Sequence, residues 1–470
     1  ILHNWWGNGV FVEYETGNWC EGITAYLADH LIKEQRGQGA AYRRDQLQKY
    51  ADYVSGDEDF PLTAFRSRHS GATQAVGYGK TAMMFHMLRM ELGDETFVEA
   101  LRKLYRDNAF RRASFYDVQA AFEAAAGREM NPFFESWVRR VGAPALAIES
   151  AEASSIGGHG LHIVLRQVHE GEPFPLLVPV AVTLEGHDEA YLVNLPMVGK
   201  VLDQIIPLSG KPVRVQVDPD FDLFRRLDRR EIPPSFGQAF GAEKVTLVLP
   251  SRAAAGVLQG LRELAETWSG SSAGTVETVL DTELDELPAD RAVWVFGWDN
   301  RFLPAVADGM SGYGAVLTAE GLAQGNDRLN RSDRSVVAAV GNPANPEMAV
   351  AFLGADNVAA IPGLGRKLPH YGKYGYLAFE GNEPSNTYKG SWSAVDSPMD
   401  AVIGDPNGDS PSPGTRPGRQ ALATLPPVFS EKAMREHVAA LAADELEGRG
   451  CGSAGLAAAA YIENRFQSIG

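Results

Sequence analysis

The hydrophobic pattern of this chain of 470 residues changes its period twice, and each change marks a different kind of structure. From residue 1 to about 143 the apolar residues recur at helical spacing. Thr81 to Leu92 (TAMMFHMLRMEL) places four apolar side chains on one stripe, and Ser114 to Ala125 begins with a serine suited to an N-cap. Pro132 to Val141 is predicted to form a further short helix. The pattern therefore predicts a mostly helical domain over residues 1–143.

Between residues 145 and 220 the period becomes two. Short β-rich segments alternate there with Gly, His, Asp and Pro, which is typical of an antiparallel sandwich with short connections. We predict such a sandwich over residues 144–225, with strands at Leu146–Glu149, Leu161–Val168, Leu176–Leu184, Ala190–Leu195 and Val213–Val217.

A third pattern begins near residue 240. Val245 to Leu249 is typical of a buried strand, and Ser251 is a candidate cap for a following helix that ends near Trp268. Strand-like runs recur at Ala292–Phe296 and Ser335–Val340, and a helix-like run follows at Pro346–Leu353. This alternation predicts an α/β domain with parallel strands over residues 240–396.

The end of the chain has a different composition. Residues 397–427 hold seven prolines together with Gly, Ser and Asp, which predicts a linker. Residues 428–470 contain two helical patterns, Ser430–Ala443 and Leu456–Phe466, and are predicted to begin a second α/β unit that is only partial. The fold class predicted for the whole chain is multidomain α+β. Because the chain starts within an apolar run, we also expect it to be part of a longer protein.

Charge and cysteine content narrow the possible functions. The chain has 43 Lys and Arg against 60 Asp and Glu, a net charge of −17, which argues against a nucleic-acid-binding surface. Its two cysteines exclude a disulfide-rich scaffold and a cysteine zinc finger. There is no run of about 18 apolar residues, so no membrane span is predicted.

His3 and Glu21 are the first candidates for chemistry. A histidine on one helix and a glutamate that opens the next can converge as nitrogen and oxygen ligands of one Zn²⁺. The alternative for His3 is an ordinary core histidine, because a single His among apolar neighbours is more often structural.

The residues around this pair resemble a known family. Residues 3–8 (HNWWGN) and 18–26 (NWCEGITAY) are similar to the second half of the H-E-x-x-H zinc motif of the aminopeptidase N-type gluzincins, which ends in W-x-x-E-G. The resemblance implies a thermolysin-like helical lobe with one Zn²⁺, in which His3 is the second ligand and Glu21 the third. It also implies that the first histidine and the general-base glutamate immediately precede Ile1, so this chain alone is expected to be inactive.

A second segment of the same family lies downstream. Residues 77–80 (GYGK) precede a helix and resemble the family's Y-x-K segment, which makes Tyr78 the candidate donor to the oxyanion. The alternative is a half-buried loop tyrosine. The Arg66–His69 run (RSRH) is either a binding site for a substrate carboxylate or, as we favour, a solvated loop.

The function implied by the resemblance is that of a zinc-dependent metallopeptidase. It would hydrolyse peptides with a metal-activated water and release N-terminal residues as an aminopeptidase. The competing hypothesis is a catalytically inactive peptidase fold that acts as a binding or scaffold module. Residues 434–466 also resemble the opening of bacterial leucyl aminopeptidase-type di-zinc peptidases, in which His437 would be a helix-surface residue and not a ligand.

Overall fold

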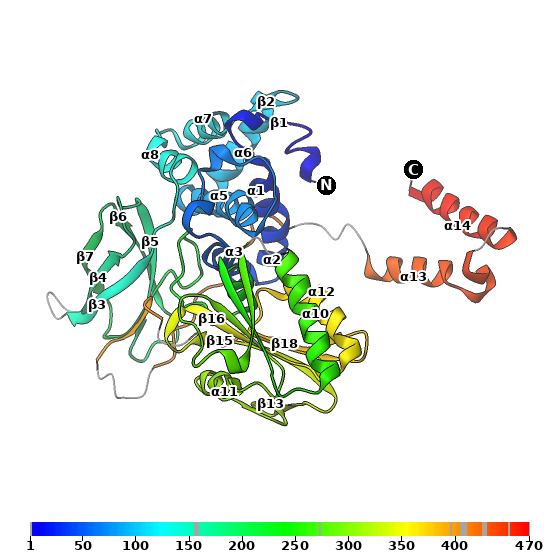
Figure 1. Ribbon diagram of the computed structural model, residues 1–470. Coiled ribbons are helices and arrows are strands. Elements are labelled where there is room, and N and C mark those ends of the chain that lie inside the picture. Colours follow the sequence, from blue (N-terminus) through cyan, green and yellow to red (C-terminus); the bar gives the residue numbers. More distant parts are fainter. Residues whose placement is uncertain are drawn as a thin grey trace. The chain divides into compact units, whose positions relative to one another are not determined.

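The computed structural model describes residues 2–154, 159–271, 274–394, 397–404, 411–424, 430–449 and 452–469. They divide into two compact units, the first ending at Gln420 and the second beginning at Ala421. The first unit contains a helical part, two antiparallel sheets and a larger mixed sheet (Figure 1).

The helical part forms where the sequence has helical periodicity. α5 has the bounds predicted, and Ser114 caps α7 by accepting hydrogen bonds from the backbone N–H groups of Tyr116 and Asp117. Three π-helical turns, η3 (Tyr26–His30), η6 (Ala75–Lys80) and η7 (Glu135–Arg139), interrupt the α-helices. The helices are α1 (Cys20–Ala25), α2 (Leu31–Gln35), α3 (Gly39–Tyr53), α4 (Gly71–Gln74), α5 (Thr81–Leu92), α6 (Asp94–Asn108), α7 (Phe115–Ala126) and α8 (Asn131–Phe134). Two short strands, β1 (Phe11–Val12) and β2 (Arg112–Ala113), pair in parallel.

Two antiparallel sheets follow, in the orders β3-β4-β7 and β19-β8-β5-β6. Each of the five segments with a period of two forms a strand. Two further strands, β7 and β19, were not predicted. The sequence of β7, VLDQIIPL, mixes polar and apolar residues without clear alternation, and β19 lies in the segment expected to be a linker. The strands are β3 (Leu146–Ser154), β4 (His159–Gln167), β5 (Leu176–Leu184), β6 (Tyr191–Met197), β7 (Val201–Leu208), β8 (Pro212–Val217) and β19 (Asp400–Val402).

The third region is a mixed sheet in the order β10-β9-β11-β16-β15-β17-β18. Its strands are β9 (Lys244–Leu249), β10 (Thr275–Leu280), β11 (Ala292–Phe296), β15 (Arg334–Asn342), β16 (Asn345–Gly354), β17 (Tyr376–Glu380) and β18 (Ser385–Gly390). One face packs against α9 (Phe236–Phe240), α10 (Ala255–Ser271) and α12 (Ile361–Lys367). The other packs against α11 (Leu303–Ser311) and a small sheet of β12 (Ala315–Thr318), β13 (Gly321–Gln324) and β14 (Asp327–Asn330) (Figure 1).

The structure corrects three expectations for this region. The predicted helix Pro346–Leu353 is wrong, because these residues form the central strand β16, whose apolar run is buried on both faces. The parallel-strand prediction holds only for β9, β10, β11 and β16, since β15, β17 and β18 run antiparallel. Ser251 lies four residues before α10 begins, and its backbone N–H donates instead to the Asp281 carboxylate at 3.0 Å.

The proline-rich segment also differs from the expected linker over 397–427. Asp400–Val402 pairs with β8 as β19, and the backbone N–H of Thr415 donates to the carbonyl of Asp188 at 2.7 Å. Residues 411–420, which we call the strap, therefore pack against the first unit instead of leading away from it. Arginine side chains account for this difference, because Arg416 and Arg419 form ion pairs with Asp220 and Asp222.

The second unit contains two α-helices and a 3-10 segment. α13 (Glu431–Leu441) and α14 (Ser453–Ile469) form close to the two predicted positions, with η11 (Asp444–Arg449) between them. Nδ1 of His437 lies 2.8 Å from the Tyr461 hydroxyl, so this histidine makes a helix–helix contact. Cys451 lies outside the described residues. Across both units, none of the described helices combines the length and the apolar character that crossing a membrane requires.

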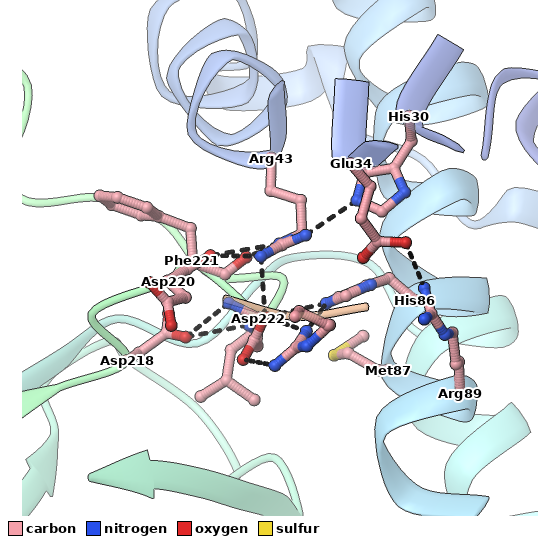
Figure 2. Close-up of polar contacts among 12 residues, drawn as sticks. His30, Glu34, Arg43, His86, Met87, Arg89, Asp218, Asp220, Phe221 and Asp222 are labelled. Carbon is pink, nitrogen blue, oxygen red and sulfur yellow. Dashed lines mark hydrogen bonds and ion pairs between the residues drawn. The ribbon is translucent and has the colours of Figure 1, made fainter. Parts of the chain in front are cut away.

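A buried carboxylate, Asp222, joins three parts of the first unit. Its Oδ1 atom lies 3.1 Å from Arg43 on α3 and 3.0 Å from Nε2 of His86 on α5 (Figure 2). Arg419 of the strap donates two hydrogen bonds of 2.8 Å to the same carboxylate. Burial alone would raise the pKa of Asp222, but hydrogen bonds from His86 and Arg419 and the charge of Arg43 hold it well below its usual range.

The two histidines in this cluster are neutral. Burial and the neighbouring Arg43 charge lower the pKa of His86 to about 3. Burial, His86 and Arg43 lower the pKa of His30 to about 2, and Nε2 of His30 lies 2.8 Å from the Arg43 guanidinium, which can only donate. Each histidine is therefore protonated more readily in the unfolded chain than in the folded one.

This difference predicts an acid-dependent loss of stability that can be assigned to one side chain. The pKa of His86 is lower when folded than the unfolded value of about 6.5, so its contribution is fully present above pH ~6.5 and is lost as the pH falls toward about 3. In His86→Gln, the free energy of unfolding should fall with acidification less steeply than in the wild type, by up to about 1.4 kcal/mol per pH unit. Urea titrations between these pH values measure both slopes, and parallel slopes would contradict the assignment.

Candidate functional site

His3 and Glu21 meet at the N-terminal edge of the helical part. His3 lies in a 3-10 turn, η1 (Leu2–Asn4), and Glu21 lies in the first turn of α1. Nε2 of His3 is 3.7 Å from Oε2 of Glu21, and both side chains remain partly exposed. The two residues that the sequence predicts as ligands are thus brought together.

The other ring nitrogen of His3 faces the protein. Nδ1 lies 3.2 Å from the carbonyl oxygen of Trp6 and 3.4 Å from Sγ of Cys20. A proton on Nδ1 that is donated to the Trp6 carbonyl leaves the lone pair of Nε2 directed toward the Glu21 side, which is the usual arrangement around a metal-ligating histidine. The Cys20 thiol donates to the same carbonyl at 2.9 Å, and burial raises its pKa to about 12, so it stays protonated.

Aromatic packing holds the connection between the two residues. The rings of Trp6 and Trp19 meet edge to face with centroids 6.0 Å apart, and Trp6 meets Tyr105 in the same way at 6.1 Å. The indole N–H of the fully buried Trp19 donates to the carbonyl of Ala113 at 2.8 Å. The Trp-rich string that carries the sequence resemblance therefore anchors the loop between His3 and Glu21 to α6 and β2.

Tyr78 stands next to Glu21. It lies in the π-helical turn η6, a local irregularity that often occurs at functional sites, and its ring is half-buried. Burial raises the pKa of Tyr78 to about 12, and the Glu21 carboxylate adds to the shift. The phenol is therefore protonated at neutral pH and able to donate a hydrogen bond.

Close backbone contacts position Tyr78 relative to Glu21. A Cβ atom added to Gly22 would lie 2.3 Å from Cβ of Thr81, so α1 and the start of α5 touch at this glycine. A Cβ added to Gly77 would lie 2.1 Å from the ring of Phe65, which meets the Tyr78 ring edge to face at 5.9 Å. Glycine at these two positions therefore permits the approach that places the glutamate beside the tyrosine.

Lys80 connects the same turn to the end of the helical part. Its side chain is completely buried, and Nζ donates to the carbonyls of Arg140 at 3.0 Å and Gly142 at 3.2 Å. Burial lowers the pKa of Lys80 to about 8. The lysine of the predicted Y-x-K segment thus serves as a structural anchor for the turn that carries Tyr78.

The donor atoms present fit part of a zinc site. Two ligands about 2.1 Å from a tetrahedral Zn²⁺ lie about 3.4 Å apart, close to the 3.7 Å between Nε2 of His3 and Oε2 of Glu21. An imidazole nitrogen and a carboxylate oxygen are ligands that zinc accepts. Within the described ranges no group of three or more His, Cys, Asp or Glu side chains could hold a metal, so this pair is a partial ligand set.

Sequence reasoning missed several residues that build the site. The contacts of Phe65 with Gly77 and Tyr78 had no signal in the sequence, and neither did the thiol contact of Cys20 with His3. Gly22 directly follows the glutamate of the motif, so its position could have indicated a close helix contact. Arg66 donates to the carbonyls of Glu15, Thr63 and Phe65 and braces the loop, which agrees with the favoured interpretation of that run.

Comparisons with known proteins match the same part of the chain. Residues 1–137 match the family described as the Peptidase family M1 domain. Aminopeptidase 2, mitochondrial, of Saccharomyces cerevisiae is 23% identical over 155 residues, 32% of this chain and 16% of the relative. Aminopeptidase N of Lactococcus lactis is 28% identical over 173 residues, 33% of this chain and 19% of the relative. The match thus spans less than a fifth of the length of these relatives.

A solved structure, aminopeptidase A of Legionella pneumophila in complex with aspartic acid, aligns with a TM-score of 0.36 and 17% identity over 58% of this chain and 30% of that one. At that score the alignment does not define a shared fold. The resemblance seen in residues 3–8 and 18–26 is confirmed by the sequence matches. The N-terminal part of the chain, residues 1–137, is a peptidase family M1 domain of the aminopeptidase N type.

Proposed function

We propose that the protein is a zinc-dependent metallopeptidase that releases N-terminal residues from peptides. The observation that carries this proposal is the meeting of His3 and Glu21 at 3.7 Å, with Tyr78 beside them, inside an M1 peptidase domain. A bound Zn²⁺ would lower the pKa of a water molecule toward about 7 and polarise the scissile carbonyl.

The side chains of this chain would have distinct tasks in that reaction. Nε2 of His3 and the Glu21 carboxylate would hold the metal, and the Trp6 carbonyl would orient the imidazole through Nδ1. The Tyr78 hydroxyl would donate a hydrogen bond to the oxygen of the scissile carbonyl as negative charge develops there. The sequence resemblance implies one further histidine ligand and a general-base glutamate, roles that His3, Glu21 and Tyr78 do not fill.

The assignment of Glu21 as a ligand predicts a loss of zinc. In the full-length protein, Glu21→Gln should lower zinc affinity by at least about 100-fold, because losses of 10–100-fold already follow from changes to groups that only support a ligand. Zinc retained after dialysis against a graded chelator measures this, with Glu15→Gln as the control, since Glu15 is exposed on the same loop. Equal zinc retention in the two variants would remove Glu21 from the ligand set.

The role of Tyr78 predicts a different result. Tyr78→Phe should keep zinc bound and lower kcat on aminoacyl anilides by about 10²–10³-fold, because one donor to the developing oxyanion is lost. Tyr14→Phe is the matched control, since Tyr14 is 52% exposed. The inactive-module hypothesis predicts instead that the unmodified full-length protein hydrolyses no aminoacyl substrate at all.

The contact between Gly22 and Thr81 predicts a positional effect. Gly22→Ala should lower the free energy of unfolding by about 1–3 kcal/mol through overpacking and should reduce kcat, because α1 must move away from the Tyr78 turn. Gly270→Ala is the control, since Gly270 lies in α10 with open space around its Cβ position, and it should be neutral or slightly stabilising. Urea denaturation and steady-state kinetics measure both effects, and a Gly22→Ala protein with unchanged stability would contradict the packing argument.

A further inference from the structure

A cleft of about 650 Å³ lies between α3 and the segment Pro369–Tyr374, which comes from the region of the mixed sheet. This volume is within the range of about 300–1,000 Å³ that is common for ligand pockets. No sequence pattern indicates this cleft, because its two walls are about 300 residues apart along the chain.

Tight contacts hold the second wall of the cleft against the helical part. A Cβ atom added to Gly237 would lie 2.9 Å from the Asp52 carboxylate, and one added to Gly372 would lie 2.7 Å from the Tyr53 hydroxyl. Asp52 also accepts hydrogen bonds from Arg229 at 2.6 Å and from the Ser235 hydroxyl at 3.2 Å. The segment that faces α3 is therefore fixed by close packing and a buried carboxylate.

Among the charged residues that line the cleft, Lys49 is the one that favours an anionic ligand. Asp52 is already paired with Arg229, and Asp45 lies 3.3 Å from Nζ of Lys373. Lys49 is half-buried, and no hydrogen bond or ion pair joins its ammonium group to another of the described residues. Burial lowers the pKa of Lys49 and the charge of Lys373 adds to the shift, while the carboxylates of Asp45 and Asp29 oppose it without forming a hydrogen bond or ion pair with Lys49. A carboxylate in the cleft would provide the missing partner.

The walls also suit a peptide. Tyr53, Tyr371 and Tyr374 line the cleft and present apolar ring surfaces together with polar hydroxyl groups. The aromatic residues would contact side chains and peptide planes, while Lys49 would recognise charge.

One part of the cleft lining lies on the helix that leads to Tyr78. Gln74 lines the cleft, and this residue ends α4 one helical turn before Tyr78, in a helix that continues directly into the π-helical turn η6. A substrate with its scissile bond at Tyr78 could therefore extend along α4 and α3 toward Lys49.

We infer that this cleft binds the part of a short peptide on the carboxyl side of the scissile bond, and that Lys49 pairs with its free C-terminal carboxylate. The inference rests on the proposed peptidase function and names its substrate class as short peptides with a free carboxyl end. It also assigns a task to the region of the mixed sheet, which supplies one wall of the subsite.

Equilibrium binding tests this inference without depending on turnover. The probe is a tetrapeptide whose first peptide bond is reduced and cannot be hydrolysed, prepared with a free C-terminal carboxylate and as its C-terminal amide. Calorimetry with the full-length protein should show the carboxylate form binding about tenfold more tightly than the amide, as expected for one charge-assisted hydrogen bond. In Lys49→Met this preference should disappear, and in Lys49→Arg it should remain.

Lys103→Met serves as the matched control, because Lys103 lies on α6 and pairs with Asp107 on the surface, outside the cleft lining. It should keep the tenfold preference. A preference that persists in Lys49→Met, its absence from the wild type, or no binding of either peptide would overturn the inference. Hydrolysis of aminoacyl anilides is measured separately: carboxylate preference without hydrolysis would refute the proposed function alone, and hydrolysis without the preference would refute the subsite alone.

Discussion

The buried carboxylate of Asp222 is the charge on which the contacts between the parts of the first unit depend. It lies where the antiparallel sheets give way to the mixed sheet, and its partners come from α3, α5 and the strap. Burying the carboxylate without these partners would cost free energy of folding, and so would burying the Arg43 guanidinium without the carboxylate. Helices, sheets and strap are therefore each needed to neutralise charges that the others bury.

The candidate catalytic residues lie away from this cluster, on elements that it helps to hold in place. His30 and Glu34 stand on the helical stretch that begins with α1, and His86 stands on α5, while Glu21 and Thr81 are at the first turns of those same helices. The contact of Gly22 with Thr81 sets the separation of the helices at one end. Further along, the hydrogen bond between the Tyr26 hydroxyl and Nδ1 of His86 joins them. The position of Tyr78 relative to Glu21 thus depends on how these two helices pack at both of these contacts.

Local signals in the sequence predicted much of this structure, and long-range pairings accounted for what was missed. The stripe in Thr81–Leu92 and the cap at Ser114 predicted α5 and α7, because both depend on residues within one or two turns. Pro346–Leu353 was misassigned, since a short apolar run buried on both faces looks the same in a strand as in a helix. His3, Glu21 and Tyr78 were found through a motif, whereas the partners of Asp222 at positions 43, 86 and 419 share no pattern.

The position of Arg419 has a consequence for how the protein is made. This arginine lies 333 residues after His86, its neighbour in the Asp222 cluster. At about 5–20 residues per second, a ribosome needs on the order of tens of seconds to synthesise the chain between them. Throughout that interval the nascent helical part holds His86 and Arg43 without the strap that completes their surroundings. Its final structure is reached only after the whole mixed sheet has emerged, so the helical part is translated before the mixed sheet and completed after it.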